Sequence, residues 1–329
     1  MVYLTRLFEL NSPKFKQLMT TPFSQQPHSL LMVRPACFGF NTQTSGSNAF
    51  QLQEDVSRLS MQKKALVEFD QLINDFSSKD ISCLVVEDTL APEKLDAIFP
   101  NNWFTTHEDG KLILYPMLAE NRRLERRPDI IDLLKIKFTV NQVIDLSAEE
   151  NHGRFLEGTG SIIFDHVNRI AYACRSPRTN ESLFIKLCLQ LEYKPIIFDA
   201  LDENKKSIYH TNVMLWIGEK TVGVCLDSIQ NEDDQEKVLS SFERTHHKVV
   251  AISYEQMRSF AGNMLEVKDK RGERYLAMST TALNSLLPGQ LNEVSKHAEP
   301  LPVSISAIEK YGGGGIRCML AGVHLPLRH

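Results

Sequence analysis

The chain has 329 residues, a formal charge of −4 and a pI near 6.2. This length can bury a large core, either as two ordinary domains or as one wide domain. The balanced charge and the lack of a long basic run argue against nucleic acid as a partner. The start has no apolar segment with a cleavage site, and no segment reaches membrane-spanning length. We therefore expect a cytoplasmic protein that does not bind a membrane.

Six cysteines are spread along the sequence without a CxxC pair. In a reducing compartment we do not expect disulfides. Three cysteines lie inside apolar runs and are predicted to be small core residues: Cys83, Cys188 and Cys225. No His, Cys and carboxylate cluster has the spacing of metal ligands, and no phosphate-binding glycine fingerprint follows a strand. The sequence therefore predicts neither a metal nor a cofactor.

The first elements along the chain are an apolar strand, a long helix and a second strand. The strand is expected within residues 29–38 (SLLMVRPACF), the helix over 55–76 and the second strand over 81–88 (ISCLVVED). The helix is expected to bury one face, formed by Leu59, Leu66, Phe69, Ile73 and Phe76. These three elements lack a partner strand near them in the sequence.

A repeated pattern follows in the rest of the chain. Residues 101–147 predict a short strand, a polar turn, a second strand, a helix and a third strand. The same plan recurs over residues 158–200, 210–253 and 261–306. The turns DHVNR, IGEK and KDKRGER suit hairpins. In the helix of the second unit, Leu183, Leu187 and Leu191 lie one above another.

The last element is the apolar stretch at residues 315–325 (GIRCMLAGVHL), which predicts a strand. It would complete a fifth unit with the N-terminal elements, so that the two ends of the chain share one blade. A period of roughly forty to fifty residues is typical of propellers and arrays. We therefore expect an α/β fold, a five-bladed α/β-propeller of ββαβ units, formed by residues 1–329 as a single catalytic domain. An ordinary α/β sandwich with coincidental similarity is the alternative.

A closed ring would bring the starts of its first strands together at the axis. The residues at those starts are Asn101 and Asn102, Glu157, His210 and Asn212, Asn263, and Cys318. A thiol, an imidazole and a carboxylate from three units form the set needed for nucleophilic catalysis. The glycine run before Cys318 would let the backbone pass close to a ligand, and it predicts a thiol that is presented rather than buried. Taken singly, each residue also has an ordinary structural reading, such as a turn cap.

The motifs at these positions resemble those of the guanidine-modifying pentein superfamily, which includes arginine deiminases, dimethylarginine hydrolases and amidinotransferases. The resemblance covers nearly the whole chain and implies a five-bladed α/β-propeller. FLEGTGSIIFD, YHTNV and GGGGIRCM are similar to the catalytic motifs. They imply Glu157 as the triad acid, His210 as the general acid/base and Cys318 as the nucleophile. SPRTN implies Arg178 as a clamp for a substrate carboxylate, and the weaker match NRRLERR implies Arg122 as a substrate-binding residue.

Departures from the superfamily pattern bear on the substrate. Members that hydrolyse guanidines usually hold the cation with carboxylates, whereas this chain has Asn101 and Asn102 in the first motif. Thr106 and His107 stand where those members have an acidic pair. Asn212 stands two residues after His210, where deiminases have another carboxylate. Losing anionic partners for a buried cation would cost several kcal/mol, while amides suit a neutral ureido group with both acceptor and donors. NNWFTTHEDG and GGGGIRCM together look most like the citrulline-utilisation hydrolases.

We therefore expect hydrolysis of the ureido group of citrulline or a close relative, to ornithine, ammonia and carbon dioxide, through a covalent thiol intermediate. The predicted substrate-binding residues are Arg178, Arg122, Asn101, Asn102, His107 and Asn212. One alternative is a guanidine substrate, such as arginine or a methylated arginine, with Glu108 or Asp109 supplying a carboxylate. Another is a non-catalytic ligand-binding propeller. The expected partner is a small amino acid, and the sequence leaves the oligomeric state open, a homodimer included.

Overall fold

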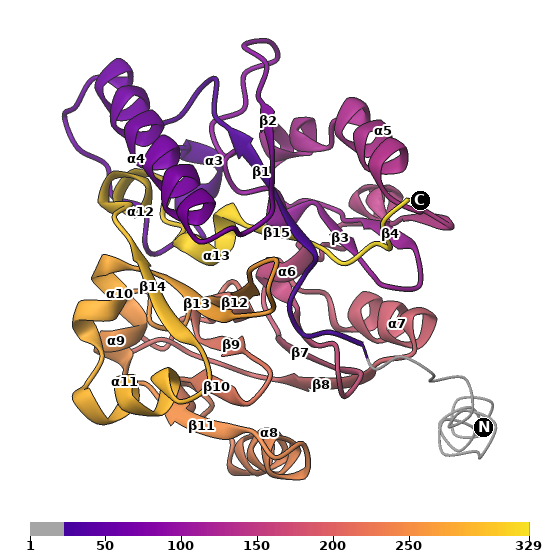
Figure 1. Ribbon diagram of the computed structural model, residues 1–329, viewed down its shortest axis with the longest axis vertical. Helices are drawn as coiled ribbons and strands as arrows, with labels where there is room; N and C mark the ends of the chain where they lie inside the picture. Colours follow the sequence, from indigo (N-terminus) through magenta and orange to yellow (C-terminus); the bar gives the residue numbers. More distant parts are fainter. Residues whose placement is uncertain (1–22, 329) are drawn as a thin grey trace.

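A computed structural model describes residues 23–328 of the chain. The strands of this part form five three-stranded sheets. In each sheet, the first and second strands of a unit pair antiparallel, and the second and third pair parallel. The parallel pairs need a crossover, which a helix supplies. The predicted α/β fold of five ββαβ units is therefore confirmed (Figure 1).

The strands are short, as the sequence pattern predicts. The first strands of the units are β3 (Phe104–Thr106), β6 (Ile163–Asp165), β9 (Leu215–Ile217), β12 (Leu265–Lys268) and β15 (Ala321–Val323). The second strands are β4 (Lys111–Leu114), β7 (Ile170–Cys174), β10 (Thr221–Val224), β13 (Arg274–Ser279) and β1 (Ser29–Arg34). The third strands are β5 (Gln142–Asp145), β8 (Lys194–Phe198), β11 (Lys248–Ala251), β14 (Glu299–Val303) and β2 (Cys83–Glu87).

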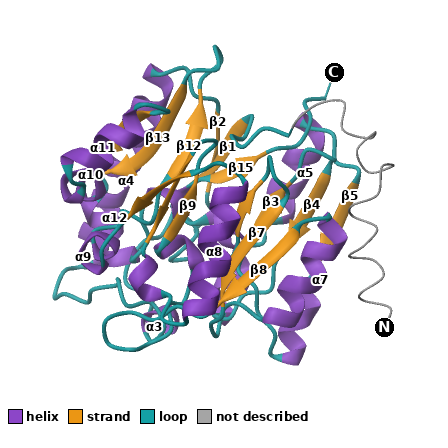
Figure 2. Cartoon of the chain, turned by 90° about the horizontal axis from the view of Figure 1, so that it is seen from below, coloured by secondary structure: helices purple, strands orange, loops and turns teal. Residues whose placement is uncertain are grey.

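The helices lie outside the sheets, as Figures 1 and 2 show. The crossover helices are α4 (Arg58–Ser78), α5 (Pro128–Lys137), α7 (Glu181–Leu191), α8 (Glu232–Arg244), and the pair α10 (Thr280–Ser285) and α11 (Pro288–Ser295). Helix α7 begins after Asn180, whose side chain accepts a hydrogen bond from the Leu183 amide. Its leucines Leu183, Leu187 and Leu191 are buried on one face, as predicted. Among the described residues, no helix combines the length and apolar character needed to cross a membrane.

The buried face of helix α4 matches the prediction only in part: Phe69 and Phe76 are buried as predicted, whereas Leu66 and Ile73 are half-buried. Its buried side chains are Met61, Ala65, Phe69, Leu72 and Phe76. Leu59 was expected in this stripe but is 65% exposed, because six residues separate it from Ala65, which places it about 120° around the helix from that residue. The observed stripe keeps the spacing of three and four residues that a helix needs to bury one side.

The fifth sheet joins strands from both ends of the described chain. Strand β15 pairs antiparallel with β1, so that Ser29 faces Val323, and β1 pairs parallel with β2. Across units, β15 lies beside β3, β6 beside β9, and β9 beside β12. The first strands therefore surround a common axis, and the residues that precede them meet there.

Single helical turns precede most of the first strands, where the sequence predicted extended chain. These turns are η1 (Pro100–Asn102), α6 (Gly158–Ser161), η4 (Thr211–Val213) and α13 (Ile316–Met319). In α6, crowding at the axis requires glycine at residue 158, because a Cβ there would lie 2.3 Å from the carbonyl oxygen of Asn101. Gly158 also has a φ of +44°, in the left-handed region that favours glycine. Of the predicted core cysteines, Cys188 and Cys225 are buried, and Cys83 is partly buried.

Candidate active site

The starts of the first strands do converge at the axis. The hydroxyl of Thr159 donates to the carbonyl of Asn101 at 3.3 Å, which joins the first two units. The amide of Asn263 donates to the carbonyl of Asn212 at 2.9 Å. The backbone N–H of Arg317 in turn donates to Oδ1 of Asn263 at 3.1 Å. Short polar segments from different units are thus bonded to one another around one point.

Cys318 lies at this point, in helix α13, and only 8% of it is exposed. The prediction of a presented thiol is therefore wrong. Its Sγ accepts hydrogen bonds from Nδ2 of Asn263 at 3.3 Å and of Asn212 at 3.5 Å. Burial raises the pKa of the thiol, while the two amides and the charge of Arg317 oppose that rise. In the free protein, the thiol is therefore held mainly in its neutral form.

The glycine run before Cys318 accommodates protein side chains packed against it. A Cβ on Gly312 or Gly314 would lie within 3 Å of the ring of Phe99. Gly313 has a φ of +65°, and a Cβ there would lie 2.7 Å from the side chain of Asn48. The run is thus needed for close packing around the thiol, which explains why glycines and a buried cysteine occur together.

His210 and Glu157 form a buried pair beside this cysteine motif. Nε2 of His210 lies 2.8 Å from Oε2 of Glu157, whose other oxygen accepts the N–H of Leu118 at 3.0 Å. The imidazole fits because residue 160 is glycine: a Cβ there would lie 2.8 Å from Nδ1 of His210. Burial lowers the pKa of His210 to about 4, although Glu157 opposes the shift. The imidazole is therefore neutral at pH 7 and can accept a proton.

Glu157 remains ionised in spite of its burial. Burial acts to raise the pKa of this carboxyl, but the charge of Arg178 and the hydrogen bond with His210 outweigh that effect. The net pKa lies well below the ordinary value. An ionised carboxylate in this position orients His210 and would stabilise its protonated form.

Arg178 connects Glu157 with a segment that covers the site, residues 41–52, which we call the flap. Its Nη1 lies 3.4 Å from Oε2 of Glu157, and its Nη2 donates to the carbonyl of Thr44 at 3.3 Å. Its Nε donates to the hydroxyl of Ser47 at 3.2 Å. The ring of Tyr209 lies 5.0 Å from the guanidinium carbon. Arg178 thus lies at the site, with flap oxygens as its present partners.

Arg122 uses four of its five N–H donors in hydrogen bonds to protein partners. It forms a two-pronged ion pair with Glu125, with both N–O distances 2.8 Å, and Asp96 lies 3.7 Å away. Its Nη1 donates to Oδ1 of Asn102 at 2.9 Å. The predicted contact of Arg122 with substrate stays a prediction, and one N–H of Nη1 is left for it. Arg122 positions Asn102.

The three asparagines predicted at the site each carry one buried atom without a hydrogen-bond partner among the described residues. These atoms are Oδ1 of Asn101, Nδ2 of Asn102 and Oδ1 of Asn212. Their opposite amide atoms are bonded to Thr159, Arg122 and Cys318, respectively. Buried polar atoms are almost always paired in folded proteins. These two acceptors and one donor, one of them on an asparagine that contacts the thiol, therefore point to a polar ligand.

His107 does not lie with these residues. Its Nε2 lies 3.2 Å from the hydroxyl of Thr105, and its ring packs against Phe164 with centroids 5.4 Å apart. The structure does not bring His107 to Cys318, and its predicted role in substrate binding stays a prediction. Strand β3 separates His107 from Asn102, and a strand rises about 3.3 Å per residue. The two ends of the NNWFTTH motif thus face different regions.

The carboxylates considered for a guanidine substrate also lie elsewhere. Glu108 accepts the backbone N–H of Ser24 at 2.8 Å, and Asp109 is paired with Lys111 within the β3–β4 turn. Both follow β3, at the end of the strand away from Asn102. They do not supply an anion beside Cys318.

Two adjoining cavities lead to the thiol. A small one of about 10 Å³ is lined by Cys318, the glycine run and Phe50 of the flap. A larger one of about 840 Å³ shares Phe50, Tyr209 and Phe260 with it and opens outward. The sequence reading missed the flap and Tyr209 as site residues. The flap's polar sequence NTQTSGSN marks a loop, but nothing in it indicates which surface the loop covers.

The structure is similar to solved enzymes. It matches the N-terminal domain of ArgZ bound to substrate, described as an arginine dihydrolase from the ornithine–ammonia cycle in cyanobacteria, with TM-score 0.70 and 15% identity, over 91% of this chain and 99% of that one. It matches AgrE in complex with ornithine and NAD⁺ with TM-score 0.69 and 17% identity, over 93% of this chain and 40% of that one. A dimethylarginine dimethylaminohydrolase adduct with S-methyl-L-thiocitrulline matches with TM-score 0.60 and 14% identity, over 90% and 99%.

These likenesses bear on the fold alone. The chain spans about two fifths of full-length ArgZ and of AgrE. A comparison of the sequence with curated proteins gives no match. The family described as eukaryotic N,N dimethylarginine dimethylhydrolase, however, matches residues 34–325. The chain therefore belongs to this family of the guanidine-modifying superfamily and is a hydrolase acting on carbon–nitrogen bonds.

Proposed function

We propose that the protein hydrolyses the ureido group of citrulline or a close relative, releasing ornithine, ammonia and carbon dioxide. The observation that carries this proposal is the set of unpaired amide atoms on Asn101, Asn102 and Asn212. A ureido group offers one carbonyl acceptor and several N–H donors, which complements one free donor and two free acceptors. A guanidinium offers only donors and a positive charge.

The charges around the thiol favour the same ligand. The described carboxylates of this region are Asp96, Glu125 and Glu157, and each lies within 4 Å of Arg122, Arg178 or His210, although Oδ1 of Asp96 has no hydrogen-bond partner among the described residues. A guanidinium would leave water without gaining a free anion, and isolated buried charges are strongly disfavoured. A penalty of about 3 kcal/mol would correspond to a discrimination of roughly a hundredfold in kcat/KM.

The α-carboxylate of the substrate would bind Arg178. Its guanidinium presently donates to neutral oxygens of Thr44 and Ser47 in the flap. A carboxylate forms stronger, charge-assisted and two-pronged bonds with a guanidinium than hydroxyl or carbonyl oxygens do. Substrate would therefore replace flap contacts at Arg178, which links binding to displacement of the flap.

The steps of the proposed reaction follow from the protonation states of Cys318 and His210. His210 accepts the thiol proton as Cys318 Sγ attacks the ureido carbon, since the imidazole starts neutral. Glu157 stabilises the imidazolium, which then protonates the departing amine of ornithine. The remaining thiocarbamate is hydrolysed by water that His210 deprotonates, which restores the thiol and releases carbamate. Carbamate breaks down to ammonia and carbon dioxide.

A second candidate is hydrolysis of N,N-dimethylarginine to citrulline and dimethylamine. The family match over residues 34–325 favours it. It would require an anion for the guanidinium, and Glu157 is the carboxylate closest to the catalytic group, paired with His210. The same Cys318, His210 and Glu157 would act in both reactions.

Paired kinetics separate these candidates. Purified protein is incubated in turn with citrulline, N,N-dimethylarginine and arginine, and ornithine, dimethylamine and ammonia are measured. We expect ornithine from citrulline and little consumption of either cation. Turnover of a cationic substrate with none of citrulline would overturn the proposal. Asn212→Asp should shift the ratio towards arginine, whereas the control Asn74→Asp, at an exposed position of α4, should not.

A further inference from the structure

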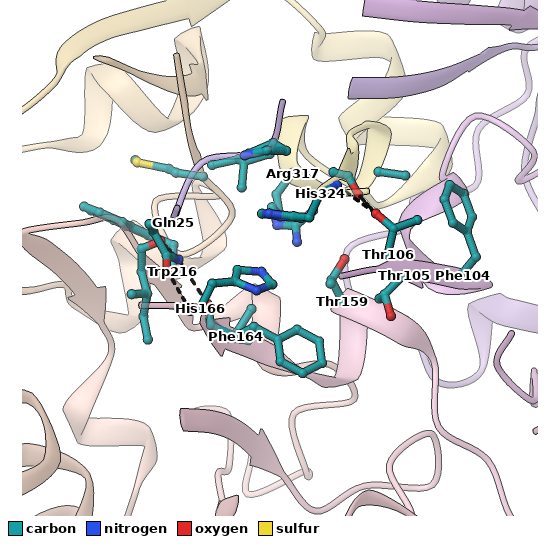
Figure 3. A pocket seen from close by; sticks show the side chains of 17 residues that line it. Gln25, Phe104, Thr105, Thr106, Thr159, Phe164, His166, Trp216, Arg317 and His324 are labelled. Carbon is teal, nitrogen blue, oxygen red and sulfur yellow. Dashed lines mark hydrogen bonds between the residues drawn. The ribbon is translucent and has the colours of Figure 1, made fainter. Parts of the chain in front are cut away.

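A second buried cavity lies on the axis, on the other side of the residues that hold the thiol. Its volume is about 40 Å³, and Figure 3 shows its lining. Thr159 of α6 and Arg317 of α13 line it, although neighbours of both in sequence, Gly160 and Cys318, belong to the catalytic side. These two helical turns therefore separate the cavity from the active site.

Arg317 is a buried cation without an ion-pair partner among residues 23–328. Only 9% of the residue is exposed, and its Nη1 donates to the carbonyl of Leu320 at 2.7 Å. Burial lowers the pKa of this guanidinium to about 10, with the neighbouring Cys318 opposing the shift. A guanidinium with pKa about 10 is still charged at pH 7, and a buried unpaired charge is unfavourable.

Histidines complete the lining. The rings of His324 and His166 lie 4.0 Å apart, and in Figure 3 they face the same space as Arg317. Nδ1 of His324 has no hydrogen-bond partner among the described residues, and only 6% of the residue is exposed. Nδ1 of His166 lies 2.8 Å from the hydroxyl of Tyr193. One orphaned imidazole nitrogen thus lies on the wall beside an unpaired cation.

Among the described residues that line the cavity, Arg317 carries the one formal charge at pH 7, because burial keeps His166 and His324 neutral. Burial lowers the pKa of His324 well below its ordinary value, and the neighbours that lower it further are His166, His28, Arg317 and Lys268. The buried carboxylates of the adjoining strands have partners of their own. Asp165 accepts from Asn168, and Glu266 accepts from Gln26 and from the backbone of Glu219. Neither carboxylate lines the cavity, so among the described residues its lining holds one positive charge and no anion, which gives the cavity a positive potential.

We propose that this cavity binds a small inorganic anion, between the guanidinium of Arg317 and the imidazole of His324. One water needs about 10–15 Å³ of such space, so the cavity has room for a halide or a planar oxyanion such as nitrate. A metal ion is a poor fit, because within residues 23–328 no group of three or more His, Cys, Asp and Glu has suitable geometry. The cavity is too small for an amino acid.

An anion bound in the cavity would change the pKa of the Cys318 thiol through its effect on the charge of Arg317. The positive charge of Arg317 lowers the pKa of Cys318. An anion bound to Arg317 would offset that field and make thiolate formation less favourable. Because coupling between two sites is reciprocal, formation of the thiolate would weaken anion binding by the same factor. The anion would therefore act as an inhibitor that binds apart from the substrate.

The direct test uses bromide with crystals of the full chain. We expect an anomalous difference peak in the cavity, within hydrogen-bonding distance of Arg317 and His324. Absence of bromide from this cavity at saturating concentration would overturn the proposal. This measurement uses wild-type protein and no substrate, so its failure would leave the proposed citrulline reaction intact.

Thermal unfolding of variants provides the second test. Sodium bromide and sodium nitrate should raise the Tm by about 2 °C over sodium gluconate at equal ionic strength, because a ligand that binds only the folded state stabilises it. Arg317→Gln and His324→Gln should each lose this increment. The control Arg271→Gln removes a guanidinium that is 70% exposed and should keep it. Equal anion-dependent increments in wild type and both cavity variants would contradict the proposal.

The rate of Cys318 alkylation provides the third test, because it measures whether an anion in the cavity affects the thiol. Bromide should slow the reaction of Cys318 with iodoacetamide severalfold in wild type, and Arg317→Gln should remove this dependence. An unchanged bromide effect in Arg317→Gln would show that the anion acts elsewhere.

Discussion

The two cavities on the axis differ in how their positive charges are balanced. On the side of Cys318, Arg122 is paired with Glu125, and Arg178 lies beside Glu157. On the other side, Arg317 has no carboxylate partner among the described residues. Less than 10% of each arginine is exposed, so burial alone does not explain the contrast.

Because of this difference in pairing, the cavity at Cys318 is a polar site and the cavity at Arg317 is a charged one. Where arginines are paired, the free groups are amide atoms, and the expected ligand is neutral at its reacting end. Where the arginine is unpaired, the expected ligand is an anion. The backbone that separates the sites is only one helical turn thick at α13, since consecutive residues Arg317 and Cys318 line opposite cavities.

The largest expected effect tests which cavity is reactive. Cys318→Ala should reduce turnover of citrulline by about four orders of magnitude or more, because removal of a nucleophile abolishes the covalent route. The fold should persist, since a smaller side chain replaces a thiol whose partners are neutral amides. Ornithine release and the thermal unfolding curve would be measured together. Near wild-type turnover by the variant would place the chemistry elsewhere.

The next prediction concerns a variant that leaves an arginine on the Cys318 side unpaired, as Arg317 is in the anion cavity. Glu125→Gln leaves the buried guanidinium of Arg122 without its main anion. Breaking one partner of a buried ion pair costs about 3–5 kcal/mol, and urea unfolding should show a loss of this order. The matched control Glu181→Gln breaks the exposed pair with Arg175 and should cost less than about 1 kcal/mol. Similar losses for both would show that Arg122 does not depend on Glu125.

A smaller effect is expected at the predicted clamp. Arg178→Lys should raise the KM for citrulline about 10- to 100-fold, because lysine cannot form the planar two-pronged contact with a carboxylate. A substrate analogue without the α-carboxylate should show little change in KM. Equal changes for the two compounds would indicate that Arg178 acts only through Glu157 or the flap.

The fold was predictable because its signals are local and repeated. Each unit carries a hairpin turn and one helix with a buried stripe, and strands β15 and β1 pair as joining the ends of the sequence predicts. The error at Leu59 arose because apolar residues lie on two neighbouring faces of α4, and their spacing alone does not show which of the two is buried.

The site was predictable only where each unit contributes an equivalent position. Glu157, His210 and Cys318 occupy such positions, and the structure brings their motifs together. His107 lies apart from these residues because strand β3 separates it from Asn102. Burial of Cys318 could not be predicted, since the flap that covers it contacts the glycine run across more than 260 residues of sequence.

The smallest predicted effect concerns pH, and it tests whether the histidines on the anion side are neutral in the folded protein. The pKa of His324 lies well below its ordinary value because of burial and neighbouring positive charge. When the pH falls from 7.5 to 5.5, the unfolded chain gains a proton at this residue and the folded protein does not. Stability is therefore lost as the pH falls, by about 1.3 kcal/mol for one such histidine.

His324→Gln should reduce the pH-dependent loss of unfolding free energy by this amount, measured with urea at the two pH values. The control His152→Gln alters an exposed residue and should retain the full wild-type loss. Bromide should also reduce the loss in wild type, because an anion beside His324 would favour its protonation in the folded state. A pH dependence of His324→Gln that equals that of wild type would mean that His324 is not held neutral, and the positive potential inferred for this cavity would then lack one of its two supports.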